Sequence, residues 1–151
     1  KRTTAENVVG NVDMDKLVIE PYANPFRVYP LGQDFADFKD LFEKNHTACY
    51  ILNTGFYKGK KVKPADTLGS IEKIVESQAK FVPFGSMEGM SYLAIEGFEV
   101  DFDDAKYVAA LRTRMQSRLD FILAQKTEND GYNTLPDEAA ELMQKVINEL
   151  A

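Results

Sequence analysis

The residues best placed to do chemistry lie in one segment, where a polar turn leads into a lysine-rich loop and then into a helix. The turn is Asn53-Thr54-Gly55, and the loop carries Lys58, Lys60, Lys61 and Lys63. Loop amides and the start of a following helix favour anions, so the pattern points to a phosphorylated or other small anionic ligand. Two interpretations stay open here, a ligand-binding loop and a solvated lysine loop.

Other sequence patterns with a known chemistry are missing. The chain has neither the G-x-x-x-x-G-K-[ST] phosphate loop nor the G-x-G-x-x-G dinucleotide fingerprint. His46, the single histidine, stands where a helix should end, which favours a surface or capping role. Residues 101–104 (Asp101-Phe102-Asp103-Asp104) lack the glycine and final glutamate of a calcium loop, and indicate an acidic helix start instead. We therefore expect no catalytic residue and no metal site in this chain.

A strand before the lysine loop and a helix after it must hold the loop in place. Ala48–Leu52 is a continuous apolar run, which predicts a strand buried on both faces, with Cys49 as a reduced core residue. Large apolar residues at helical spacing predict helices over about 34–45 and about 66–77. The order helix, strand, loop, helix is typical of α/β proteins.

The remaining pattern predicts a mixed α+β fold, with one small mixed sheet and about four helices. The elements expected downstream are irregular strands at 81–84, 92–95 and 98–102, a helix over about 103–124, a linker at 127–135 and a helix over about 136–150. Residues 1–32 contain two short apolar runs, at 8–9 and 17–19, and several Gly and Pro residues interrupt the segment. This pattern predicts irregular chain with one or two short strands. We divide the chain into an N-terminal segment packed on the domain (1–32), a central region (33–125) and a linker with the last helix (126–151).

The composition narrows the partners. An excess of 24 Asp+Glu over 18 Lys+Arg, for a net charge of −6, argues against a nucleic-acid partner, which binds mainly through neutralised phosphates. No apolar stretch approaches the roughly 20 residues that span a bilayer, so we do not expect a membrane among the partners. A single cysteine favours a cytoplasmic location. The start at Lys1, without methionine or a following apolar segment, suggests a piece cut from a longer polypeptide.

Two segments resemble ATP-dependent phosphoenolpyruvate carboxykinase. Cys49-Tyr50-Ile51-Leu52-Asn53-Thr54-Gly55-Phe56 is similar to that family's strand ending in Leu-Val-Asn-Thr-Gly-Trp. Gly59-Lys60-Lys61-Val62, followed by the helix that contains Thr67, is similar to its Gly-Lys-Arg-Ile and Thr-Arg-Ala-Ile-Ile elements. Together with weaker turns and the long helix, the resemblance covers about residues 28–122.

The resemblance implies specific roles in nucleotide binding. In that family this stretch belongs to the C-terminal, nucleotide-binding lobe, where the Arg-Ile pair and the helix threonine contact the adenine side of ATP. By position these roles fall on Lys61, Val62 and Thr67. The residues depart from the family at Lys61, which lacks a guanidinium, and at Leu68, which replaces an arginine.

The resemblance also implies what the chain lacks. The family's phosphate loop, divalent-metal ligands and substrate-binding arginines lie upstream, so ATP binding needs that upstream part of the polypeptide. The family converts oxaloacetate and ATP to phosphoenolpyruvate, ADP and CO2, and we expect the isolated chain to be inactive. Two alternatives remain: a non-catalytic carboxykinase-derived scaffold with a degenerate pocket, and an unrelated α/β module for small anions. The latter becomes preferable if Ala48–Leu52 lies at the edge of a sheet and not at its centre.

Overall fold

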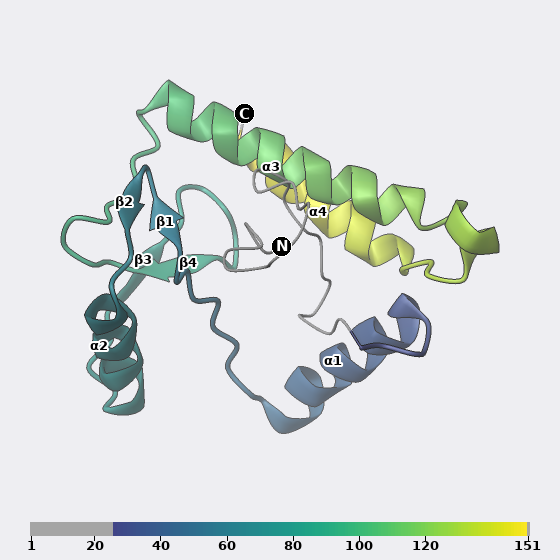
Figure 1. Cartoon of the computed structure of the whole chain (residues 1–151), viewed down its shortest axis with the longest axis horizontal. Coiled ribbons are helices and arrows are strands. Elements are labelled where there is room, and N and C mark those ends of the chain that lie inside the picture. Colours follow the sequence, from purple (N-terminus) through teal and green to yellow (C-terminus); the bar gives the residue numbers. More distant parts are fainter. Residues whose placement is uncertain (1–25, 151) are drawn as a thin grey trace, which may run out of the picture.

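The computed structural model of the chain describes residues 26–150, which form a mixed α+β fold of four α-helices and two small β-ribbons (Figure 1). The elements are α1 (Leu31–Asn45), β1 (Phe56–Tyr57), β2 (Lys60–Lys61), α2 (Pro64–Val75), β3 (Phe81–Pro83), β4 (Ser91–Leu93), α3 (Ala105–Ala124), the 3-10 helix η2 (Glu128–Gly131) and α4 (Asp137–Glu149). The predicted fold class and the four predicted helices are confirmed. The strands expected near residues 8–9 and 17–19 lie outside the described residues.

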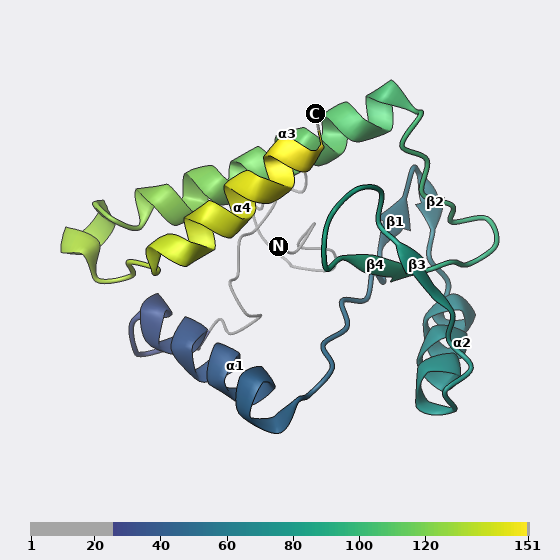
Figure 2. The same cartoon turned by 180° about the vertical axis from the view of Figure 1, so that it is seen from behind.

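Helices α3 and α4 lie side by side and antiparallel, and they form the longest packed unit (Figures 1 and 2). Asp104 caps α3, because its carboxylate accepts hydrogen bonds from the backbone N–H groups of Lys106 and Tyr107. Leu119 on α3 and Ile147 on α4 are both buried. The acidic start predicted at residues 101–104 is therefore confirmed as the cap of the long helix. Within residues 26–150, no helix is both long and apolar enough to cross a membrane.

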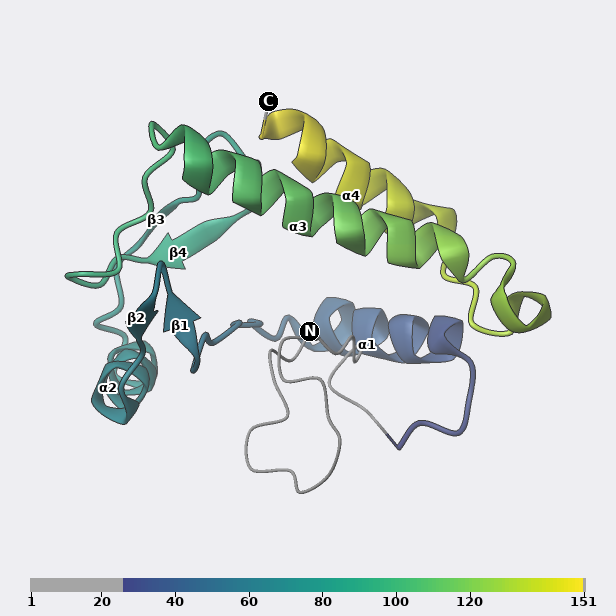
Figure 3. The same ribbon diagram turned by 45° about the horizontal axis from the view of Figure 1, so that its top comes forward.

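Helix α1 is anchored at its first turn to the loop that precedes α4 (Figure 3). The backbone N–H of Leu31 donates to Oδ1 of Asn133, and Leu31 itself is completely buried. Lys39 then reaches α4, where its ammonium lies 2.7 Å from a carboxylate oxygen of Glu138. At the other end, His46 takes the left-handed conformation of a helix C-cap, with φ of 50°, and is exposed, as its surroundings predict.

The two ribbons gather near the start of α3, with α2 beyond them (Figure 1). In the first ribbon, β1 pairs antiparallel with β2, with Phe56 opposite Lys61, and Gly59 supplies a turn residue with φ of 80°. In the second, β3 pairs antiparallel with β4, with Phe81 opposite Leu93. The small sheet expected from the sequence is thus divided into two separate two-stranded ribbons.

Three predictions about local structure are wrong. Ala48–Leu52 forms no strand: it is an exposed connection between α1 and β1, and Ile51 in it is 97% exposed. Cys49 is accordingly exposed and not part of a core. An apolar run becomes a buried strand only where another strand pairs with it, and no strand between residues 26 and 150 does so. Residues 98–102 also form no strand: the backbone carbonyl of Glu99 accepts from the hydroxyl of Tyr57, and the Asp101 carboxylate accepts from the backbone N–H of Asp103.

Candidate functional site

A hollow of about 900 Å³ lies between the two ribbons, α2 and the connection at residues 49–53. Tyr57 and Val62 come from the first ribbon and its end, and α2 contributes the face that carries Thr67 and Ile74. The volume lies within the range of about 300–1,000 Å³ that small-molecule sites occupy. We refer to this feature as the ring-lined hollow.

The chemistry of the lining is aromatic and nearly uncharged. Six aromatic side chains line it: Tyr50, Tyr57, Phe81, Phe84, Tyr92 and Phe98. The only charged lining residue is Asp66, whose Oδ2 accepts a hydrogen bond from the backbone N–H of Lys63 at 2.8 Å. A pocket of this kind suits a flat, apolar or weakly polar group better than a phosphate.

The start of α2 also lacks the character of an anion site. Its first turn contains Pro64, which has no N–H, and Asp66, whose carboxylate already accepts from the cap residue. The carboxylate therefore occupies the positive end of the helix that a phosphate would need. The anion site that the sequence suggested at this helix start finds no support in this geometry.

Two of the three site residues predicted from the sequence lie on the ring-lined hollow. Val62 is held there because its backbone N–H donates to the carbonyl oxygen of Gly55 at 2.9 Å, which closes the first ribbon. Thr67 is brought there by the first turn of α2. Lys61 is not among the lining residues, and its ammonium lies 5.0 Å from the centroid of the Phe56 ring on the same ribbon.

Two further lysines of the loop are also engaged within the chain. The ammonium of Lys60 donates to the carbonyl oxygen of Gly97 at 3.0 Å and lies 4.3 Å from the ring centroid of Phe98. Lys58 pairs with Asp104 at 2.9 Å and lies 4.8 Å from the centroid of the Tyr107 ring. These lysines therefore attach the ribbon to its neighbours, an arrangement that neither the solvated-loop nor the ligand-loop interpretation predicts.

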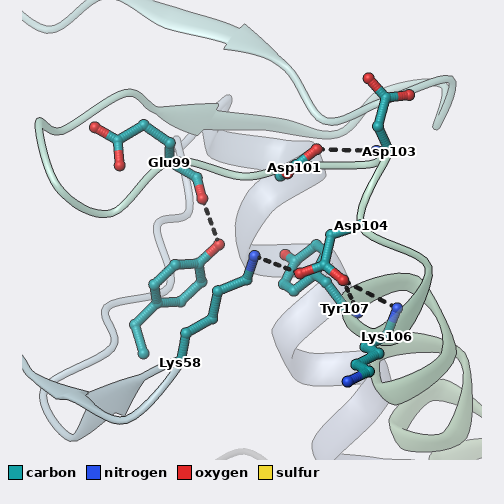
Figure 4. Close-up of polar contacts among 8 residues, drawn as sticks. Lys58, Glu99, Asp101, Asp103, Asp104, Lys106 and Tyr107 are labelled. Carbon is teal, nitrogen blue, oxygen red and sulfur yellow. Dashed lines mark hydrogen bonds and ion pairs between the residues drawn. The ribbon is translucent and has the colours of Figure 1, made fainter.

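The cluster around Lys58 fastens the first ribbon to the start of α3 (Figure 4). Its contacts include a hydrogen bond of 2.7 Å from the hydroxyl of Tyr57 to the backbone carbonyl of Glu99. The hydrogen bond from Lys58, with those from the backbone at Tyr107 and Lys106, holds the pKa of the Asp104 carboxyl below its ordinary value. Burial and the nearby Tyr57 raise the pKa of the Tyr107 hydroxyl. Because Tyr57 lines the hollow, this cluster fixes one of its walls.

The lowered pKa of Asp104 makes part of the stability depend on pH. Its favourable contribution is present above the ordinary pKa of 3.8 and is lost as the pH falls through the lower folded-state value. We predict that Asp104→Asn, which keeps a capping side chain, is less stable than the natural chain at about pH 7, and that the difference becomes smaller at about pH 2.5. Urea unfolding at both pH values measures this.

The neighbouring Asp103 provides the matched control for this substitution. Its side chain forms no hydrogen bond or ion pair with any residue between 26 and 150, so Asp103→Asn should leave the stability nearly unchanged at both pH values. An equal stability loss for Asp104→Asn at neutral and acid pH would contradict a role for its charge.

Sequence reasoning missed the stacked ring pair that lines the hollow. Tyr50 and Phe81 stack with ring centroids 5.6 Å apart, but Tyr50 belongs to the run for which the sequence predicts a buried strand. The pattern of residue types does not reveal this pair, because an exposed run and a buried run of apolar residues have the same pattern. The described part of the chain has no group of three or more His, Cys, Asp or Glu that could hold a metal ion.

Comparisons with protein-family models, with curated proteins and with solved structures gave no match to this chain. The features that bear on function are therefore the geometry of the ring-lined hollow and the resemblance carried by residues 49–71.

Proposed function

We propose that the chain supplies the base-binding wall of an ATP site in a phosphoenolpyruvate carboxykinase-like protein. The observation that carries the proposal is the position of Val62 and Thr67, which both line the ring-lined hollow. Val62 offers an apolar face to a purine, and the hydroxyl of Thr67 offers a hydrogen bond to its edge. These are two of the positions that contact adenine in the family that the sequence resembles.

The proposal assigns the rest of the ATP molecule to other parts of the polypeptide. The hollow has no cationic lining residue, and the ammonium groups of Lys58, Lys60 and Lys61 are engaged elsewhere. The upstream lobe would then hold the phosphates and any divalent metal ion. The proposal places the protein in the cytoplasm. Because phosphoryl transfer depends on a phosphate cradle and a metal, the isolated chain should bind weakly and catalyse nothing.

A titration of the chain with adenosine tests the proposal, with amide chemical shifts as the readout. We predict shifts at Val62 and Thr67, and a weaker affinity in Val62→Asp, by more than about tenfold, because a buried carboxylate opposes an apolar ring. Lys61→Asp is the control, since it places the same charge one residue away but outside the hollow. Equal losses in both variants, or shifts for ribose 5-phosphate alone, would contradict base binding.

A second candidate is a carboxykinase-derived scaffold or interaction domain whose nucleotide pocket has degenerated. Leu68, at the position of a family arginine, is 65% exposed on α2, and Lys61 is engaged with Phe56. This candidate predicts that adenosine and ATP leave every amide unchanged, even when the upstream lobe is present.

An unrelated module for small anions is a third candidate. Ala48–Leu52 belongs to neither ribbon, so it is neither a central nor an edge strand and does not choose between this candidate and the first. The engaged lysines and the carboxylate at the start of α2 weigh against it. It predicts binding of inorganic phosphate or ribose 5-phosphate with no preference for a base.

A further inference from the structure

The connection between α1 and β1 leaves a row of backbone groups without partners. Between residues 26 and 150, no hydrogen bond joins the backbone of residues 47–52 to any other group. Residues 49–53 also line the ring-lined hollow. These residues are exposed, so their backbone N–H and C=O groups pair with water, and a ligand that displaces this water must pair with them in its place.

An aromatic pair stands beside these backbone groups. The rings of Tyr50 and Phe81 lie nearly parallel, with an interplanar angle of 26° and centroids 5.6 Å apart. Tyr50 is 48% exposed and Phe81 is 40% exposed, so each has surface left on which another ring can stack. Stacking on such a platform is favourable for any planar base.

The charge of the hollow selects among planar ligands. Asp66 is the only charged residue in the lining, and its carboxylate is engaged with the backbone of Lys63. An anionic ring would find no cation here, and the one carboxylate already accepts the hydrogen bond that caps α2. A neutral ring with hydrogen-bond donors and acceptors on its edge fits the stacked pair and the adjacent backbone together.

We propose that the hollow binds a neutral heteroaromatic ring that stacks on the Tyr50–Phe81 pair and whose edge is hydrogen bonded by the backbone of residues 50–52. The inference rests on the proposed function in taking the ring to be the base of the nucleotide. It adds a second set of binding residues, which lie on the connection and on β3 and not at Val62 and Thr67. Ligand binding would then explain why Ala48–Leu52 is exposed and does not form the strand predicted for it.

The test uses adenosine and the full chain, with two readouts. We expect amide shifts at residues 50–52, and slower alkylation of Cys49, which is the only cysteine, is exposed, and lines the hollow. Tyr50→Leu and Phe81→Leu remove one ring each and keep an apolar side chain. Each should weaken adenosine binding by about 5- to 150-fold, the range expected for loss of one stacked ring.

Tyr132→Leu is the matched control, because Tyr132 has a similar exposure of 53% but does not line the hollow. It should leave adenosine affinity unchanged. The Cys49 readout needs no substitution, so it remains decisive if a ring variant fails to fold. Unchanged alkylation of Cys49 at saturating adenosine, or equal affinity in Tyr50→Leu and Tyr132→Leu, would overturn the inference.

The failure of this inference differs from the failure of the proposed function. Adenosine shifts at Val62 and Thr67 without shifts at residues 50–52 would overturn the inference and leave the proposed function standing. Adenine could instead protect Cys49 while neither ATP nor ADP binds, even with the upstream lobe present. That result would overturn the proposed function and leave the inference standing. Pairing of residues 48–52 between two copies of the chain, detected as a dimer with protected amides there, would overturn the inference in favour of strand pairing.

Discussion

Leu31→Ala is expected to lower the free energy of unfolding by about 2–5 kcal/mol, the cost of removing a large aliphatic group from a closed core. Leu31 is completely buried at the first position of α1. The backbone around it has little room to collapse, since the Leu31 N–H is bonded to Asn133 and Gly32 lies close to the carbonyl of Thr134. Urea unfolding followed by circular dichroism measures the loss.

Leu142→Ala removes the same atoms from a helical residue that is 59% exposed, and is the control for Leu31→Ala. It should change stability by less than about 1 kcal/mol, as surface substitutions usually do. If the two variants lose equal stability, α1 is not anchored at its first turn, and the arrangement of α1 against the α3–α4 pair is wrong.

Gly85→Ala is the second substitution with a large expected effect, about 2–5 kcal/mol of stability. Gly85 has φ of 62°, a left-handed conformation that costs a residue with a side chain about 1–2 kcal/mol. The added Cβ would also stand 2.9 Å from the Phe102 ring. That ring is held edge-on against Phe84 with centroids 5.0 Å apart, so relieving the clash costs about 1–3 kcal/mol more.

Gly89→Ala separates these two costs, because Gly89 has φ of 75° but open space where a Cβ would lie. It should lose only the conformational part, about 1–2 kcal/mol, in the same thermal or urea unfolding experiment. Equal losses at Gly85 and Gly89 would show that the Phe102 ring gives way freely and does not brace Phe84, which lines the hollow.

The helices could be predicted from the sequence because their signals are local. Apolar spacing of three and four residues placed the long helix within two residues of its observed start, and the acidic run before it proved to contain the cap, Asp104. The strand β3 was also recognised, at Phe81–Pro83, by its short β-branched and aromatic run.

The environment of Ala48–Leu52 could not be predicted, because burial of a strand depends on partners that the run itself does not encode. The same residues would form a core strand if a neighbouring strand paired with them. Without such a strand they form an exposed connection. The destinations of Lys58 and Lys60 were equally beyond reach, since Asp104 and Gly97 are distant in sequence. Val62 and Thr67 were expected at a ligand site only from the resemblance, and a closed ribbon and the first turn of α2 bring both of them to the hollow.

Intermolecular nuclear Overhauser effects in the complex of the full chain with adenosine would show whether a purine base occupies the ring-lined hollow. We expect contacts from the base protons H2 and H8 to the methyl groups of Val62 and Thr67 and to the ring of Tyr50. Contacts from the ribose alone, or contacts of the base with the outer surface of the ribbon around Lys61, would contradict it.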